Sequence, residues 1–334
     1  MRRLVWLGVV IALLWSGWWT FAAYGLRNGA QLWLQDRRNE GWQADTAGID
    51  VAGFPTQLAL TFQNPAFADP DTGVAFETDA LRLSAPAWWP GYLTVSLPTD
   101  SFTAASPIDR ISVVAEEGVA ALRLNPGAAL ELEHAGITSG PWQIASKAGP
   151  LWAAQALDSR VQQSPQLAEQ YEIEFAAPAF TPGEVIRDAL RAPDSWPVEF
   201  DSLSAHATVT LDRPLDRLTI ESARPQPRAI DLHIAQAEWG ALLLRASADL
   251  DVSEQGLVSG DLNLQARNWQ DIVELAERSG ALPSTLRPQV ENILSALARG
   301  SGNPDTLDLT LKAQDGSVFL GFVPLGTIPP LFLR

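Results

Sequence analysis

Apolar and polar residues alternate along much of the chain after about Ala47. The clearest stretch covers residues 242–266, where the apolar positions of one side include Leu242, Leu244, Leu250, Leu262 and Leu264. A turn-type cluster, Ser253-Glu254-Gln255-Gly256, interrupts the alternation midway. A period of two is typical of strands that bury one face. The segment therefore predicts a long antiparallel hairpin with one apolar face.

The same alternation recurs at residues 111–115, 205–211 and 307–313. Helical patterns are few. Thr181 to Glu184 has the spacing of a capping box before a short helix that ends near Leu190. Asn268 is a candidate N-cap for a helix closed by Gly280, and a further helix is expected at 288–298.

These patterns predict a mainly β (α+β) chain. We expect an N-terminal transmembrane helix followed by antiparallel amphipathic hairpins. The hairpins form one or two curved sheets or a sandwich, with a few covering helices. The expected regions are an anchor at 1–23, a helical stalk at 24–46, a first β-rich region at 47–180, and a second at 181–334 with helices near 268–299.

The first apolar run, Leu4 to Ala23, holds 20 residues without a charge. At 1.5 Å per helical residue it spans roughly 30 Å, the thickness of a bilayer's hydrocarbon core. The anchor residues that we single out are Leu4, Trp6, Leu13, Leu14, Trp18, Trp19 and Phe21. A cleaved signal peptide, cut after Ala22 or Ala23, is the alternative, but its apolar region is normally shorter. The length and the flanking tryptophans favour an uncleaved anchor.

Arg2 and Arg3 precede this run and favour a cytoplasmic N-terminus. Arg27, Arg37 and Arg38 lie beyond the run, where Asp36 and Glu40 partly offset them. The sequence therefore predicts a single-pass protein of the bacterial inner membrane, with its main domain in the periplasm.

Composition narrows the class of partner. The formal net charge is −16, from 39 acidic and 23 basic residues. Such a surface repels phosphate backbones, so nucleic acid is not an expected partner. The chain has no cysteine, which removes disulfides, thiolate nucleophiles and Cys-ligated metals.

Catalytic and cofactor-binding motifs are missing from the sequence, so we expect a non-enzymatic protein without a cofactor or metal. The three histidines, His134, His206 and His233, share no ligand-like spacing. Asp69 and Asp71 have calcium-loop spacing, but the remaining ligands of such a loop are not in place, which favours a turn. The apolar pair Trp88 and Trp89 can contact a membrane or an apolar ligand, or pack at one end of a sheet, and core packing is the favoured interpretation because aromatic residues most often bury area.

Three groups of residues together resemble a known family. They are Gly41-Trp42-Gln43-Ala44 with Gly53-Phe54-Pro55, the 242–266 hairpin before Asn268-Trp269, and an end that reads Asp315-Gly316-Ser317-Val318-Phe319-Leu320-Gly321 and Leu325-Gly326-Thr327-Ile328-Pro329-Pro330-Leu331. The chain resembles a bacterial envelope family known as domain of unknown function 2125, over nearly its whole length. That family carries no assigned activity, so no catalytic residues transfer.

The resemblance extends more distantly to the AsmA-like envelope proteins, some of which enclose an apolar groove and are linked to lipid movement. Our first hypothesis is a non-enzymatic envelope protein that binds lipid or another apolar ligand, and it is motivated by the anchor and by many one-sided strands with few helices to cover them. The candidate ligand face is Leu242, Leu244, Leu250, Leu262, Leu264, Trp88 and Trp89. A structural or interaction module for an envelope protein partner is the alternative, and a hydrolase is the third hypothesis.

Overall fold

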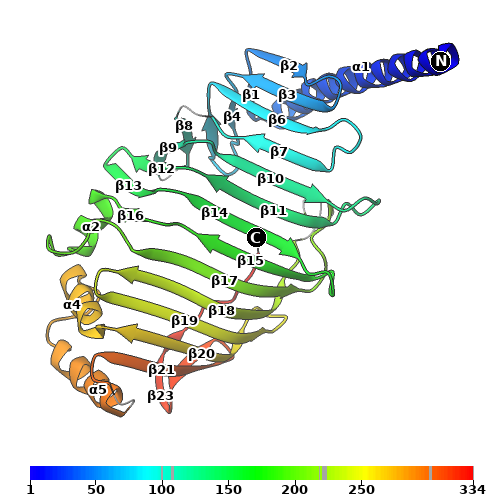
Figure 1. Cartoon of the computed structure of the whole chain (residues 1–334). Helices are drawn as coiled ribbons and strands as arrows, with labels where there is room; N and C mark the ends of the chain where they lie inside the picture. The colour runs from blue at the N-terminus through cyan, green and yellow to red at the C-terminus, as the bar shows by residue number, and fades with distance from the viewer. Residues whose placement is uncertain (99–100, 107–108, 218, 220–223, 301–302, 334) are drawn as a thin grey trace. The chain divides into compact units, whose positions relative to one another are not determined.

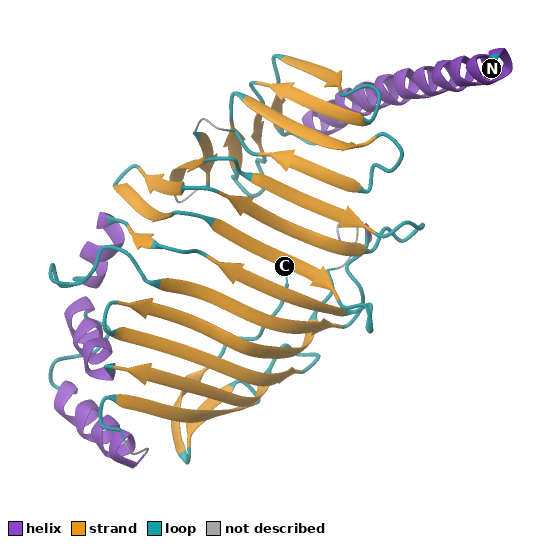
Figure 2. Cartoon of the chain, viewed as in Figure 1, coloured by secondary structure: helices purple, strands orange, loops and turns teal. Residues whose placement is uncertain are grey.

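The computed structural model describes residues 1–98, 101–106, 109–217, 219, 224–300 and 303–333. Strands make up 45% of the described residues, and four described helices accompany them (Figure 2). Over these described residues, the sheets are antiparallel and are not closed. The mainly β prediction with a long N-terminal helix is therefore confirmed.

Residue contacts divide the chain into two units. Unit 1 holds Met1–Leu124 with Thr138–Gly140 and Ile144–Lys147, and unit 2 holds Asn125–Ile137, Pro141–Gln143 and Ala148–Arg334. The expected division near residue 180 falls inside unit 2. The Pro-rich stretch around it, residues 178–197, lies beside an aromatic cluster. The ring of Phe200 stacks on that of Trp239 with centroids 4.6 Å apart, and the ring of Trp196 meets that of Trp239 edge-on with centroids 4.8 Å apart.

Unit 1 contains α1 (Arg2–Asn39) and two antiparallel strand groups. One group has the order β2 (Gly48–Ala52), β3 (Gln57–Gln63), β6 (Ala80–Pro86), β7 (Tyr92–Ser96), β10 (Val119–Leu124). The other has the order β1 (Gln43–Asp45), β4 (Ala66–Ala68), β5 (Ala75–Glu77), β8 (Phe102–Ala105), β9 (Arg110–Ala115). Residues 43–45, expected in the stalk, thus form a strand.

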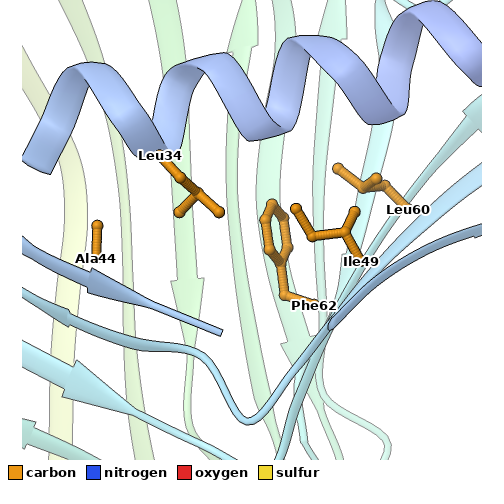
Figure 3. Packing of buried hydrophobic residues seen from close by; sticks show 5 residues of the cluster. All are labelled: Leu34, Ala44, Ile49, Leu60 and Phe62. Atoms are coloured by element: carbon orange, nitrogen blue, oxygen red, sulfur yellow. The ribbon is translucent and has the colours of Figure 1, made fainter. Parts of the chain in front are cut away.

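The second half of α1 is part of the unit 1 core. Leu34, only 4% exposed, points from the helix toward strand residues in Figure 3. This core cluster consists of Leu34, Ala44, Ile49, Leu60 and Phe62. Because Leu26 and Ala30 also pack against it, the helix beyond the apolar run is docked on the sheet and is not a free stalk.

Unit 2 is built on one long run of neighbouring strands (Figure 1). Their order is β11 (Leu132–Ser139), β14 (Leu157–Gln163), β15 (Gln170–Ala176), β17 (Ser202–Leu211), β18 (Pro227–Trp239), β19 (Leu242–Val252), β20 (Val258–Arg267), β21 (Thr306–Gln314), β22 (Ser317–Leu320), β23 (Val323–Thr327). The short strands β13 (Gly149–Ala154) and β16 (Thr181–Pro182) pair with each other. Two strands are divided between the units: β12 (Trp142–Ser146), and β11, whose last two residues belong to unit 1. The predicted hairpin is confirmed as β19 and β20, with Val252 opposite Val258.

The other helices of unit 2 are α2 (Glu184–Leu190), α4 (Trp269–Ser279) and α5 (Arg287–Gly300). Of the two predicted N-caps, Thr181 is wrong, whereas Asn268 is confirmed as the N-cap residue of α4 but makes no side-chain capping hydrogen bond. The N-cap of α2 is Gly183, because Thr181 and Pro182 form a strand. Asn268 adopts a left-handed conformation, and its side-chain amide donates to the carbonyl of Ala241 instead of capping α4.

Candidate functional site

One face of the unit 2 sheet is apolar across seven strands, β14, β15 and β17 to β21. The strand register aligns one cross-strand row as Val161, Ile173, Ala207, Leu232, Ala248, Leu262 and Leu311. The next row is Phe175, Ala205, Ala235, Ala246, Leu264 and Leu309. Because side chains alternate along each strand, these rows share one face. We call it the apolar face.

The opposite face of the same strands is polar. A row across it reads Glu172, Thr208, Asp231, Asp249, Asp261 and Lys312. Acidic residues predominate in this row, which suits solvation and not burial under a second layer. The sheet is therefore strongly one-sided, and only the apolar face requires cover.

Helices cover one end of the apolar face. Trp269 and Val273 of α4 and Ala298 of α5 form a buried cluster with Ala266 and Leu307, which lie on the sheet. Figure 2 shows α4 and α5 beside the ends of the strands. Most residues in the middle of the apolar face, by contrast, keep intermediate exposure, although Ala248 is buried, and Leu244 is 37% exposed. Helical cover therefore stops short of the centre.

The C-terminal segment covers part of the apolar face nearer its other end. Residues 331–333, which we call the strap, lie over β14, β15, β17 and β18 (Figure 1). The N–H of Leu331 donates to the carbonyl of Gly256 at 2.9 Å. Gln226 holds Leu333 twice: its Oε1 accepts from the Leu333 N–H at 3.0 Å, and its Nε2 donates to the Leu333 carbonyl at 3.1 Å. The strap is thus fastened by backbone groups at both ends.

An apolar cavity of about 420 Å³ lies between the strap and the sheet. Its lining consists of Val161, Tyr171, Ile173, Val209, Leu211, Leu215, Pro227, Ile230, Leu331, Phe332 and Leu333. Among these described residues Tyr171 has the one polar side chain, and its hydroxyl accepts the N–H of Leu215 at 2.8 Å. Burial raises the pKa of Tyr171, so it is neutral at physiological pH. The cavity presents carbon surface, and none of these lining residues is charged.

A second hollow of about 310 Å³ follows along the same face. Phe175, Leu203, Ala205, Ala237 and Leu244 are among its lining residues. Phe175 is two positions beyond Ile173 of the strapped cavity on the same strand, so the two hollows follow each other along β15. We call these two hollows, one beneath the strap and the next along β15, the apolar path.

The residues expected to form the ligand face occupy different environments. Leu244 lines the second hollow, and Leu250, Leu262 and Leu264 lie half-buried on the apolar face. Leu242 is only 7% exposed and packs into the structure.

Trp88 and Trp89 belong to unit 1, in the turn between β6 and β7. The Trp88 side chain is 65% exposed, whereas the indole N–H of Trp89 is buried without a hydrogen-bond partner among the described residues. Neither residue lines the two apolar hollows of unit 2.

The contribution of β15 and of the strap to the cavity was not predicted from the sequence. A signal was available in β15, where Tyr171, Ile173 and Phe175 alternate with Glu172 and Glu174. No comparable signal marks residues 331–333, because a short apolar tail does not reveal the strands on which it lies.

Two of the histidines come together on the polar face, although their sequence spacing gave no indication of it. The rings of His206 and His233 lie 4.6 Å apart. His206 Nε2 is 2.7 Å from a carboxylate oxygen of Glu172, and Glu174 completes a set of three groups that can hold a metal ion. These side chains are solvent-exposed, and the ion pair with Glu172 already accounts for the position of His206.

His233 also has the neighbours that a hydrolase hypothesis would seek. Its Nε2 is 2.8 Å from the Thr208 hydroxyl, and its Nδ1 is 3.4 Å from a carboxylate oxygen of Asp231. However, Thr208 lies within a strand that is paired on both sides. The ladders engage the backbone N–H groups that an oxyanion hole would need. The arrangement therefore fits a solvated polar network better than a nucleophilic site.

The anchor residues lie in the first half of α1, which is long and apolar enough to cross a membrane. Most of their side chains are exposed on the helix surface: Leu13 is 68% exposed, Leu14 is 70% exposed and Phe21 is 71% exposed. Trp19 differs, because its indole N–H donates to the carbonyl of Gln57 at 2.7 Å.

Comparison with known proteins identifies one family. A family model described as an uncharacterized protein conserved in bacteria (DUF2125) matches residues 19–329. No curated protein and no solved structure matches the chain. The resemblance inferred from the motifs is thereby confirmed for this family, whereas the AsmA-like relationship stays a prediction.

Proposed function

Because the chain belongs to the bacterial family DUF2125, whose description names no activity, we propose its function from the geometry of the apolar face. The protein is a non-enzymatic, membrane-tethered binder of a long-chain lipid or a similar apolar ligand. The ligand lies along the apolar path of unit 2, with one end beneath the strap. The AsmA-like resemblance supports the same function by analogy of fold alone.

The strapped cavity is the observation that carries this proposal. Its volume of about 420 Å³ lies within the range of small-molecule sites. Each methylene moved out of water contributes about 0.8 kcal/mol, so ten of them contribute roughly 8 kcal/mol. That is comparable with the cost of association, roughly 4–15 kcal/mol. A ligand that continues along β15 into the second hollow buries more and binds more tightly.

The membrane tether is part of the proposal. The first half of α1 spans the inner membrane, with Arg2 and Arg3 on the cytoplasmic side and the main domain in the periplasm. A domain held at the bilayer surface has its lipid source beside it. The net charge of −16 does not hinder binding of an acyl chain, since the residues that line the strapped cavity carry no charge.

Photo-crosslinking tests the ligand site directly. The full-length protein, in nanodiscs, is irradiated with a diazirine-bearing fatty acid, and the modified peptides are identified by mass spectrometry. We expect crosslinks in β15, β17 and the strap.

Leu244→Glu places a charge in the second hollow and should lower the crosslinking yield at least fivefold. Ile234→Glu is the matched control. Ile234 is 41% exposed, close to the 37% of Leu244, but it pairs with His206 on the polar face. Equal yields for the two variants, or crosslinks confined to α1, would refute the ligand path.

A second candidate function, docking of an envelope protein, is favoured by the last strand. β23 ends the strand order, and all of its residues are exposed, including Val323 at 59% and Leu325 at 55%. An exposed apolar edge can pair with a strand of another chain. Site-specific crosslinking in cells from Leu325 tests this. A discrete protein adduct supports docking, and lipid adducts alone count against it.

A further inference from the structure

The tip of the β2–β3 hairpin, Gly53 to Gln57, lies against the apolar run of α1. The indole N–H of Trp15 donates to the Pro55 carbonyl at 2.8 Å, and that of Trp19 donates to the Gln57 carbonyl at 2.7 Å. The ring of Phe54 meets the Trp19 ring edge-on, with centroids 5.5 Å apart. All of these residues belong to unit 1.

We propose that this hairpin tip is a membrane-inserted contact, with Phe54 buried among the acyl chains of the outer leaflet. The proposal rests on the membrane-spanning role of α1 given above. Trp15 and Trp19 lie inside the uncharged run that ends at Ala23. Trp15 is eight residues before Ala23, which is roughly 12 Å along a helix. Whatever medium surrounds this part of the run therefore also surrounds the tip.

The hydrogen bonding of the tip suits a medium without water. Four of its carbonyls have protein donors: the N–H of Gln57 donates to Gly53, the Trp15 indole to Pro55, the N–H of Ala87 to Thr56, and the Trp19 indole to Gln57. In hydrocarbon, an unpaired backbone group costs several kcal/mol. In water these carbonyls need no such partners. The two indoles thus satisfy two carbonyls of the tip and their own N–H groups together.

The side chains of the tip also suit a membrane environment. Phe54 is 55% exposed despite its contact with Trp19, and nearby on α1 Trp18 is 51% and Phe21 71% exposed. Aromatic side chains with one free face favour the membrane interface and its edge. Gly53 fixes the turn, because its φ is +106° and a Cβ there would lie 2.8 Å from the Gln57 carbonyl oxygen. The tip is therefore a fixed turn that presents an exposed aromatic ring beside the helix.

Depth-dependent quenching tests this placement, and the absence of native cysteine makes single labels straightforward. The full-length variants Phe54→Cys, Leu13→Cys and Asp71→Cys are labelled with NBD and reconstituted in vesicles that carry doxyl-labelled lipids. Asp71 is the aqueous control. Its neighbour Pro70 lies near Gly41, just beyond the far end of α1, and α1 extends 24 residues, roughly 36 Å, beyond Trp15.

We expect the NBD at residue 54 to be quenched by doxyl lipid at least threefold more than that at residue 71, and to resist aqueous iodide. If residue 13 is quenched and residue 54 behaves like residue 71, α1 spans the bilayer but the tip stays in water, and the proposal is overturned. If residue 13 is not quenched either, the membrane tether itself fails. Thr56→Cys repeats the measurement if the Phe54 variant does not fold.

Discussion

The docking of α1 on unit 1 makes a quantitative prediction for Leu34→Ala. Leu34 is 4% exposed and lies between the helix and the strands that follow it. If the helix beyond the apolar run were a free stalk, this side chain would contribute little to stability. Because it belongs to the core cluster, its truncation should loosen the whole contact between α1 and the strands β2 and β3.

The magnitude follows from the atoms removed. Leu→Ala deletes three carbon groups, and at about 0.8 kcal/mol each their transfer contributes roughly 2.4 kcal/mol. The cavity left among rigid neighbours adds to this, and buried Leu→Ala changes span about 2.7–5.0 kcal/mol. We therefore expect a loss of about 3 kcal/mol. In an exchange experiment governed by local opening, this is roughly a 150-fold increase in rate, since about 1.36 kcal/mol is a factor of ten.

Hydrogen exchange with mass spectrometry on the full-length protein measures this effect over residues 48–62. The control is Leu32→Ala on the same helix, where the side chain is 59% exposed and little change is expected. If the two variants exchange at the same rate, Leu34 does not fasten the helix to the sheet. A truncated chain that starts at residue 41 would lack this contact, so the full chain is the appropriate material for the ligand experiments.

Three other changes test unit 2. Gly260→Ala should lower the free energy of unfolding by about 2–4 kcal/mol in urea titrations, because the φ of Gly260 is +144° and a Cβ there would lie only 2.1 Å from the Asp249 carbonyl oxygen. An unchanged urea midpoint would contradict this. Tyr171→Phe leaves the Leu215 N–H without its acceptor and should cost about 1–3 kcal/mol. Burial raises the pKa of Tyr171, so its contribution is complete below about pH 10 and is lost as pH rises through the higher folded pKa; the variant should therefore lose less stability than the parent between about pH 9 and 11. Ending the chain after Pro330 removes the strap, which should lower fatty-acid crosslinking to β15 severalfold while raising the binding of a hydrophobic dye; unchanged crosslinking would show that the strap does not form the site.

The hairpin β19–β20 illustrates how far the local pattern reaches. Its alternation and its turn cluster specify both strands and their facing residues, and the register agrees with that prediction. Helices α4 and α5 were also predictable, from their apolar stripes and from the terminal Gly280. The N-cap position of Asn268 was predictable, but the cap at Thr181 and the absence of a capping hydrogen bond from Asn268 were not, because a cap depends on the backbone conformation that the neighbouring strands impose.

The candidate site was predicted only in part. The leucines of β19 and β20 identify an apolar face, but whether each is available depends on what covers it. Leu242 is buried and Leu244 is open, although they are two residues apart in one repeating pattern. Likewise, the pairing of His206 with His233 depends on β17 lying beside β18, a contact that spacing along the chain does not encode.

The sequence by itself determined the one-sided strands, the apolar N-terminal helix and the acidic, cysteine-free composition, because each is a property of residues close together in the chain. Only the tertiary structure decided that the strands form open sheets, that α4 and α5 cover one end of the apolar face, and that residues 331–333 lie over a cavity near the other. The physical reason is that alternation is the same for an open and a closed apolar face. Cover comes from segments distant in sequence, and only folding brings these segments onto the strands.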